Sequence, residues 1–400
     1  MIAMLISSED WTLLLAGIMA ATAIVSLILE ISKKGGKTIT KALVIITFIS
    51  ILAVSFLVLY NAVNVKEQYR DRIALLLPLS SEDENVREDA KHQFLGLMDF
   101  LHKEDFDVDV VVRSHKLETS KISEIVKQEM RDGTLYFITT MSSVAEPLAK
   151  QWDILCQENS EKGECYLIAS VASAPGISKH SKNVYRFYVR SEEEGRLLAG
   201  TAVAEWKDIL SAITICVDDH YGDGAAEKFK DFWEDTRRTV TKQVKLSSLK
   251  NTKENRLKKL TNLKFMSEED RQCIFIANYG GGMAETIQGL KDIYPRPKLL
   301  TTSTFSIDSW RNKIPSEYLE EFDWITVQPR YKANKENYLD VVRDFTYFTL
   351  LRVAYVIMKQ KENGHDFNTQ WLLAHAMPAD LRFELTEEGD AEIKLDIYKH

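Results

Sequence analysis

Cysteine is scarce in this sequence, with four residues in 400, and this excludes a small scaffold held together by disulfides. The four cysteines form no Cys-x-x-Cys pair, and no cluster of cysteine and histidine has the spacing of a zinc site. No serine, cysteine or carboxylate pair stands in a recognisable catalytic motif, so we do not expect an enzyme. An excess of basic residues is also missing: the net charge of -8 argues against a general nucleic-acid binder.

Charge is absent from two long apolar runs near the N-terminus, Trp11 to Leu29 and Ala42 to Val65. Each run is long enough to cross the hydrocarbon core of a bilayer as a helix. A cleaved signal peptide would have a basic start and a shorter apolar core, whereas Glu9 and Asp10 precede the first run. We therefore predict two retained transmembrane helices, over residues 11–31 and 42–65.

Basic residues predict how these helices are oriented. Residues 1–10 contain no lysine or arginine, and the loop of residues 32–41 has no acid but contains Lys33, Lys34, Lys37 and Lys41. The positive-inside rule places this loop in the cytoplasm and both chain ends outside. Three basic residues beyond the second helix argue mildly for the opposite orientation: Lys66, Arg70 and Arg72. We expect an inner-membrane protein whose large C-terminal domain lies on the periplasmic or extracellular side.

The stretch from Ala212 to Gly224 shows the pattern that the rest of the chain repeats. An apolar run ends at Asp218 and Asp219, a turn with two glycines follows, and a helix comes next. Continuous apolar runs are typical of strands buried in parallel sheets. We therefore predict an α/β fold with two doubly wound lobes after residue 66. Lobe 1 would span about residues 72–190 and 329–375, and lobe 2 about residues 191–328 and 376–400.

The expected strands and helices alternate along this domain. Strands are predicted over residues 72–80, 108–112, 134–138, 165–169, 183–190, 212–217, 240–246, 272–277, 298–302 and 324–328, with a terminal hairpin of 383–385 and 393–398. Helices are predicted after Gly224 and over residues 86–102, 121–131, 144–156, 192–206, 254–263, 283–293, 338–361 and 368–376. In the first of them, one face carries Phe94, Leu97, Met98 and Leu101.

Six segments, taken in order, make the chain similar to a known family: Ile73–Ser80, Ser142-Ser143, Ala172–Pro175, Asn183–Phe187, Val217–Gly222 and the hairpin around Gly389-Asp390. Together they resemble the type I periplasmic binding proteins, the fold of Leu/Ile/Val-binding proteins and receptor ectodomains. The resemblance covers roughly residues 72–399 and rests on the order and spacing of the segments. It implies two lobes that close on a ligand by hinge bending.

In lobe 1, the resemblance implies several ligand contacts. Ser142 and Ser143 match the pair that holds the carboxylate of an amino-acid ligand, and backbone around Ala172 and Ser173 would hold its polar atoms. Ser80, at the end of the first strand, is a further candidate. The residues alone leave two roles open for the serine pair, because such a pair either binds an anion at the start of a helix or caps the helix.

In lobe 2, the matching strand ends carry Asp219, Tyr221 and Tyr279. The acidic residues between 218 and 223 could suggest a divalent metal, but helix capping and turn chemistry explain them as well, and we expect no metal and no cofactor. Contact between Asp219 and a ligand ammonium remains open beside the capping role. The glycine-rich turn that follows Tyr279 lacks the Gly-Lys-Ser/Thr of a phosphate-binding loop.

The cysteines fall into two pairs. Cys156 and Cys165 flank a short polar loop that a disulfide could close in an oxidising compartment. Cys216 and Cys273 lie in apolar strands, where we expect buried thiols.

These observations predict a membrane-anchored, extracytoplasmic solute-binding protein. It would capture a small polar ligand, such as an amino acid, in a cleft between its lobes for transport or sensing, with an ABC permease or a membrane sensor as partner. The alternative is a degenerate binding-protein fold that serves a membrane complex as an interaction module and binds no small solute.

Overall fold

The structure, a computed structural model, describes residues 72–82, 84–160, 164–246, 259–260, 272–278, 280–291, 298–306, 313–330, 341–362, 369–375 and 385–399. Within these ranges, no helix is long and apolar enough to cross a membrane. The two predicted transmembrane helices lie outside the described residues, as do Tyr279 and most of the helix expected over residues 254–263.

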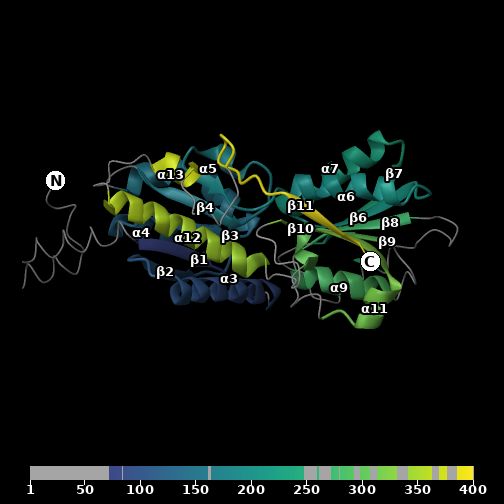
Figure 1. The fold of residues 1–400 in the computed structure, drawn as a ribbon, viewed down its shortest axis with the longest axis horizontal. Coiled ribbons are helices and arrows are strands. Elements are labelled where there is room, and N and C mark those ends of the chain that lie inside the picture. Colours follow the sequence, from purple (N-terminus) through teal and green to yellow (C-terminus); the bar gives the residue numbers. More distant parts are fainter. Residues whose placement is uncertain are drawn as a thin grey trace, which may run out of the picture. The chain divides into compact units, whose positions relative to one another are not determined.

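Five parallel strands form the sheet of lobe 1, in the order β2-β1-β3-β4-β5 (Figure 1). They are β1 (Arg72–Leu77), β2 (Asp109–Ser114), β3 (Tyr136–Thr140), β4 (Tyr166–Val171) and β5 (Val184–Arg186). In the register of the sheet, Ile73 pairs with Val110 on one side and with Tyr136 on the other. All of β1 after its first residue is buried, as its continuous apolar sequence predicts for a strand covered on both faces.

Successive residues of β1 point to opposite faces of the sheet, so lobe 1 has two cores. Ile73, Leu75 and Leu77 pack with α3 (Glu84–Lys103) and α12 (Val341–Glu362), two helices that lie side by side (Figure 1). α13 (Thr369–His375) contributes to the same core. Ala74 and Leu76 pack with α4 (Thr119–Asp132) and α5 (Ser142–Asn159).

The sheet of lobe 2 has the order β11-β10-β9-β8-β6-β7, and β11 runs antiparallel to β10. The strands are β6 (Ser211–Val217), β7 (Thr239–Leu246), β8 (Gln272–Ala277), β9 (Lys298–Thr301), β10 (Asp323–Pro329) and β11 (Leu395–Lys399). One face packs on α6 (Ser191–Glu205) and α7 (His220–Asp235), the other on α9 (Gly280–Lys291) and α11 (Ser316–Glu321). Cys216 and Cys273 are free and buried in this sheet, which confirms the prediction.

The chain passes between the lobes three times, because α12 and α13 pack on lobe 1 while β11 joins lobe 2. The predicted terminal hairpin is present in part, since Leu385 and Ala391 form an antiparallel bridge across its turn, while Phe383 lies outside the described residues. Most of the second predicted arm, residues 395–399, pairs instead with β10, as the yellow strand in Figure 1 shows. A short hairpin is marginally stable alone, whereas β10 offers a ladder of five residue pairs at the edge of an existing sheet.

Helix α3 buries only part of the apolar face expected from its sequence. Leu97 is buried, but the other three residues of that face are exposed: Phe94, Met98 and Leu101. Gly96 orients the helix, because a Cβ atom there would lie 2.2 Å from the carbonyl oxygen of Arg343 in α12. The backbones of α3 and α12 therefore meet at this glycine, and an apolar face of α3 remains on the surface.

Candidate functional site

A strained residue separates the end of β3 from the start of α5. Met141 has a φ of 64° and a ψ of 131°, a region that residues other than glycine rarely adopt. Ser142, which is buried, and Ser143, which is half-buried, then open the helix. Strain of this kind clusters at ligand sites. This strand end is therefore a candidate site on structural grounds as well.

The hydroxyl oxygen of Ser142 accepts hydrogen bonds from the backbone N–H groups of Ser173 at 3.1 Å and Ala174 at 2.9 Å. The carbonyl of Ser173 accepts a hydrogen bond from the N–H of Ser191, at 2.9 Å. The carbonyl of Ala174 accepts one from the guanidinium of Arg186, at 2.5 Å. These peptide groups are bonded within the protein, and the ligand contact expected for the backbone of this loop stays a prediction.

A buried ion pair holds the same loop from the other side. Arg186 Nη2 donates to Asp390 Oδ2 at 2.7 Å, and both side chains are almost completely buried. Ser178 Oγ donates to the second carboxylate oxygen of Asp390 at 2.5 Å. Burial lowers the pKa of Arg186, and the charge of Asp390 opposes that shift. Because Asp390 lies on the third passage between the lobes, this ion pair ties that passage to the loop.

In lobe 2, Asp219 caps α7. Its Oδ1 atom accepts a hydrogen bond from the N–H of Gly222 at 2.9 Å. The neighbouring acids have a cationic partner, since Lys245 Nζ lies 2.6 Å from Asp223 Oδ1 and 3.7 Å from Asp218 Oδ1. No group of three or more potential metal ligands occurs among the described residues. Helix capping therefore accounts for Asp219, which lies at the carboxyl end of β6, and pairing with Lys245 accounts for Asp218 and Asp223.

Tyr221 points into lobe 2 rather than out of it. Its side chain is buried, and its hydroxyl lies 2.7 Å from Thr302 Oγ1. Thr302 Oγ1 lies 3.3 Å from Thr304 Oγ1, which donates to the carbonyl of Asn278 at 2.7 Å. Burial raises the pKa of Tyr221 well above its usual value. The phenol is thus a neutral member of a hydroxyl network at the carboxyl ends of β8 and β9.

Beside this network lies Glu194, a buried carboxyl group that the sequence did not single out. Its Oε1 atom accepts a hydrogen bond from the N–H of Ser303 at 2.8 Å, and Ser303 Oγ lies 3.2 Å from the hydroxyl of Tyr188 in the first passage between the lobes. The Oε2 atom has no hydrogen-bond partner within the described ranges. Burial raises the pKa of Glu194 to about 7. In the sequence, Glu194 is the third glutamate of an acidic helix start, a pattern that indicates an exposed first turn.

The first turns of α5 and α7 meet across the two lobes. Glu146 Oε2 lies 2.6 Å from His220 Nδ1, and Glu146 Oε1 lies 2.6 Å from Lys150 Nζ. A Cβ atom on Gly224 would lie 2.6 Å from Pro175, which continues the loop of Ser173 and Ala174. The structure therefore brings the turn with Ser142 and Ser143 to the turn with Asp219 and Tyr221.

The two remaining candidate residues of lobe 1 are Ser80 and Ala172. Ser80 is exposed, and its Oγ atom lies 2.5 Å from that of Ser114 at the end of β2. Ala172 is completely buried. Ser80 thus contacts the end of β2.

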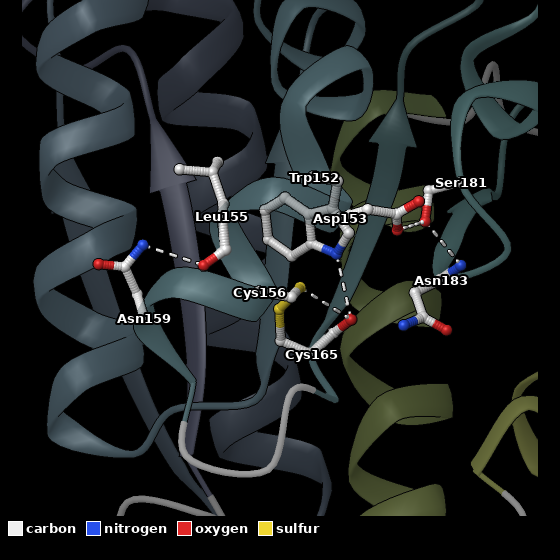
Figure 2. Close-up of a disulfide and its surroundings, with 8 residues drawn as sticks. All are labelled: Trp152, Asp153, Leu155, Cys156, Asn159, Cys165, Ser181 and Asn183. Carbon is white, nitrogen blue, oxygen red and sulfur yellow. Dashed lines mark hydrogen bonds between the residues drawn. A yellow bond between two sulfur atoms is a disulfide. The ribbon is translucent and has the colours of Figure 1, made fainter.

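Cys156 and Cys165, the pair expected from the sequence, form a disulfide with their Cα atoms 5.8 Å apart. Figure 2 shows its surroundings, where Trp152 Nε1 donates to the carbonyl of Cys165 at 3.1 Å. The disulfide joins the C-terminal part of α5 to the residue before β4. It lies at the opposite end of α5 from Ser142, so it stabilises the scaffold and does not contact the candidate site.

No family model and no curated protein matches the sequence. Several solved structures do. A solute-binding protein of an ABC transporter from R. palustris, in complex with benzoate, has a TM-score of 0.64 at 15% identity, covering 82% of this chain and 92% of that one. A leucine-, isoleucine-, valine-, threonine- and alanine-binding protein from Brucella ovis, in a closed conformation, has a TM-score of 0.63 at 14% identity, with 82% and 89% covered.

A branched-chain amino acid transporter substrate-binding protein from Streptococcus pneumoniae, in complex with isoleucine, is similar as well. Its TM-score is 0.59 at 12% identity, covering 82% of this chain and 99% of that one. Likeness at such identities shows the fold, and it confirms the predicted α/β architecture with two sheets. The three neighbours are named as binding proteins and not as enzymes.

Proposed function

Starting from the type I periplasmic binding protein fold of this chain, we propose that it is a solute-binding protein that captures a small polar ligand between its lobes. The observation that carries this proposal is the meeting of two strand-end turns from different lobes. One presents Ser142 and Ser143, and the other presents Asp219 at the start of α7. In open α/β sheets, ligands bind beyond the carboxyl ends of the strands, where these turns lie.

The proposed ligand is an amino acid or a similar small carboxylate. Ser143 opens α5, where hydroxyl and backbone donors at a helix N-terminus favour a negative group. The carboxylate of Asp219 would suit a ligand ammonium. Isoleucine and benzoate, which are bound to two of the neighbours, both carry a carboxylate.

We further propose that the two apolar runs at residues 11–29 and 42–65 anchor the protein in the inner membrane, with the binding domain on the periplasmic or extracellular side. The lysine-only loop between the runs supports this orientation. The disulfide between Cys156 and Cys165 supports it too, because disulfides persist in oxidising compartments. An ABC permease or a membrane sensor would then receive the closed, ligand-bound form.

Calorimetry tests the binding proposal. The fragment from Arg70 onward would be titrated with a panel of amino acids and with benzoate. We expect one of these ligands to bind, and Ser143→Ala and Asp219→Asn each to weaken binding by about one to two decades, the effect of losing one hydrogen bond to a charged group. Asparagine keeps the helix cap, so Asp219→Asn removes only the charge.

Asp231→Asn, on an exposed part of α7, is the matched control and should leave the affinity unchanged. If none of the ligands binds, or if both site variants bind like the control, the solute-binding proposal fails.

Cysteine labelling tests the anchoring proposal. A cysteine at Ser32 should react with a membrane-impermeant maleimide only after the membrane is permeabilised. A cysteine at Lys121, an exposed position of α4, should react in intact cells. Labelling of both positions from outside would contradict the proposed orientation.

One observation favours the second candidate function, a binding-protein fold that acts as an interaction module without a solute. The backbone N–H groups of Ser173 and Ala174 are occupied by Ser142, so this part of the loop already has its hydrogen bonds. A negative result with the ligand panel, together with copurification of a membrane protein through residues 1–71, would favour this candidate.

A further inference from the structure

Glu194 is a buried carboxyl group that no basic side chain neutralises among the described residues. It lies in the first turn of α6, its side chain is completely buried, and its Oε2 atom has no hydrogen-bond partner within the described ranges. A carboxylate that loses its hydration without gaining a cation is disfavoured, so this site favours the protonated form. Burial accordingly raises the pKa of Glu194 to about 7.

The elements that pack on α6, which are α7, β9 and β10, bring no counterion to this group within the described part of the chain. The charge that acts on Glu194 there is that of Glu193, which is negative and pairs with Arg190. Tyr221 of α7 is a neutral phenol, because burial and the charge of Glu194 raise its pKa. Charged residues at the starts of these elements are paired elsewhere: His220 with Glu146, Asp223 with Lys245, and Lys298 with Asp323.

A chain of contacts joins Glu194 to lobe 1. Its Oε1 atom accepts a hydrogen bond from the N–H of Ser303, whose Oγ atom lies 3.2 Å from the hydroxyl of Tyr188. The ring of Tyr188 packs edge-to-face on Phe345 of α12, with the ring centroids 5.0 Å apart. Burial raises the pKa of Tyr188, and the charges of Glu194 and of Asp89 in α3 add to this shift. Helices α3 and α12 of lobe 1 therefore cover the network to which Glu194 belongs.

We propose that Glu194 makes the closure of the lobes, and with it the affinity for the solute, dependent on pH. Opening the lobes would draw α3 and α12 away from Tyr188 and Ser303, let water reach Glu194 and allow it to ionise. Closure would then take up one proton, so acid favours the closed form. The consequence for affinity rests on the proposed solute binding, whereas closure itself can be measured without a solute.

The size of the effect follows from the pKa of Glu194 in the two forms. In the closed form the pKa is about 7, and a hydrated glutamate in the open form would return toward 4.5. Because the closed form has the higher pKa, the ratio of closed to open molecules is largest in acid and falls as pH rises toward 7. Between pH 6 and pH 8 it should fall about tenfold, and it should change little at higher pH.

Pulsed electron spin resonance on the purified full chain, without solute, tests this inference. Spin labels at Lys121→Cys on α4 and Lys230→Cys on α7 occupy exposed positions in different lobes. The native Cys216 and Cys273 are buried, and the other two cysteines are bonded to each other. We expect a shorter and a longer label distance, and a ratio of short to long that falls about tenfold from pH 6 to pH 8. A single distance, or a ratio that does not depend on pH, would overturn the proposal.

Two variants assign the pH dependence to one residue. Glu194→Gln keeps an acceptor for the N–H of Ser303 but cannot ionise, so its ratio should change by less than about twofold over the same range. Glu193→Gln, the matched control on the next residue, should behave like the wild type. An undiminished pH dependence in Glu194→Gln would contradict the proposal and assign the effect to another group, such as His220. A pH-dependent ratio in a chain that binds no solute in calorimetry would refute the proposed function alone.

Discussion

Lobe 1 buries a charged pair beside its strand ends, whereas lobe 2 buries a carboxyl group with one oxygen that no described residue bonds. In lobe 1, Arg186 and Asp390 neutralise each other, and Ser178 bonds the second oxygen of the carboxylate. In lobe 2, Glu194 has one backbone donor, from Ser303, and lies next to neutral hydroxyl groups. The two lobes thus share a fold but differ in how they satisfy buried charge.

This difference affects how substitutions in the two lobes should change the stability of the domain. The buried pair of lobe 1 locks the loop around Ala174. The carboxyl group of lobe 2 changes its charge near neutral pH, because burial raises its pKa to about 7. We therefore expect the substitution of Asp390 to lower stability by breaking the pair, and the substitution of Glu194 to change how stability depends on pH.

The largest effect is expected for Asp390→Ala. Removing one partner of a buried pair leaves an uncompensated charge, which typically costs about 3–5 kcal/mol. Urea unfolding would measure the loss. Asp396→Ala in lobe 2, which breaks an ion pair between Asp396 and the exposed Arg330, is the control and should have little effect. A small change for Asp390→Ala would mean that the pair does not hold the loop.

Glu194→Gln should come next in size. The carboxyl group has a pKa near 4.5 when unfolded and about 7 when folded. Between these values, the folded state keeps a proton that the unfolded state has lost, so stability falls as pH rises from about 4.5 to 7 and the loss is complete above 7. The total loss corresponds to roughly 3 kcal/mol.

Glutamine cannot ionise, so Glu194→Gln should be more stable than the wild type at pH 8 and closer to it at pH 5. Thermal unfolding across this range measures the difference. Parallel pH profiles for the two proteins would show that Glu194 does not titrate as described.

The disulfide is a second difference between the lobes. Lobe 1 contains the bond between Cys156 and Cys165, while the thiols of lobe 2 are free. Replacing both bonded cysteines by serine should destabilise the domain by about 2–3 kcal/mol in the chain-entropy model for a short loop. Hydrogen exchange should rise in β4 and the end of α5 before it rises in β6. Uniform changes in both lobes would argue against this local effect.

The smallest effect is expected at the helix cap of lobe 2. Asp219→Ala removes the acceptor for the N–H of Gly222 and should cost about 1 kcal/mol, as losses of N-caps do. Asp219→Asn keeps an acceptor and should cost little. Equal losses for the two variants, measured by urea unfolding, would show that the charge and not the cap stabilises α7.

Periodicity and turn chemistry predicted most strands and helices, because buried parallel strands are continuous apolar runs. β8, for example, begins and ends at the predicted residues, Gln272 and Ala277. The pairing of β11 could not be predicted in the same way, since a strand reveals its own pattern but not which edge it joins. The apolar residues of α3 were recognised, but the sequence does not show that three of the four are exposed when Gly96 packs against α12.

The sequence predicted which strand ends lie at the candidate site, but not which hydrogen bonds their side chains make. Ser142 and Asp219 stand where expected, yet one bonds the neighbouring loop and the other caps its helix. Glu194 was missed, because a glutamate at the start of a helix normally faces water. Its burial depends on Ser303, more than a hundred residues away in the chain. Such long-range contacts leave no local pattern.

Native mass spectrometry of the domain, purified without denaturation, tests the central claim most directly. A solute-binding protein whose lobes close on a small ligand should carry a fraction of that ligand through purification. We expect a bound mass that disappears on denaturation and is reduced in Ser143→Ala and Asp219→Asn. A domain that shows only the mass of its own chain, and gains none after incubation with the amino-acid panel, would contradict the proposal that it binds a solute.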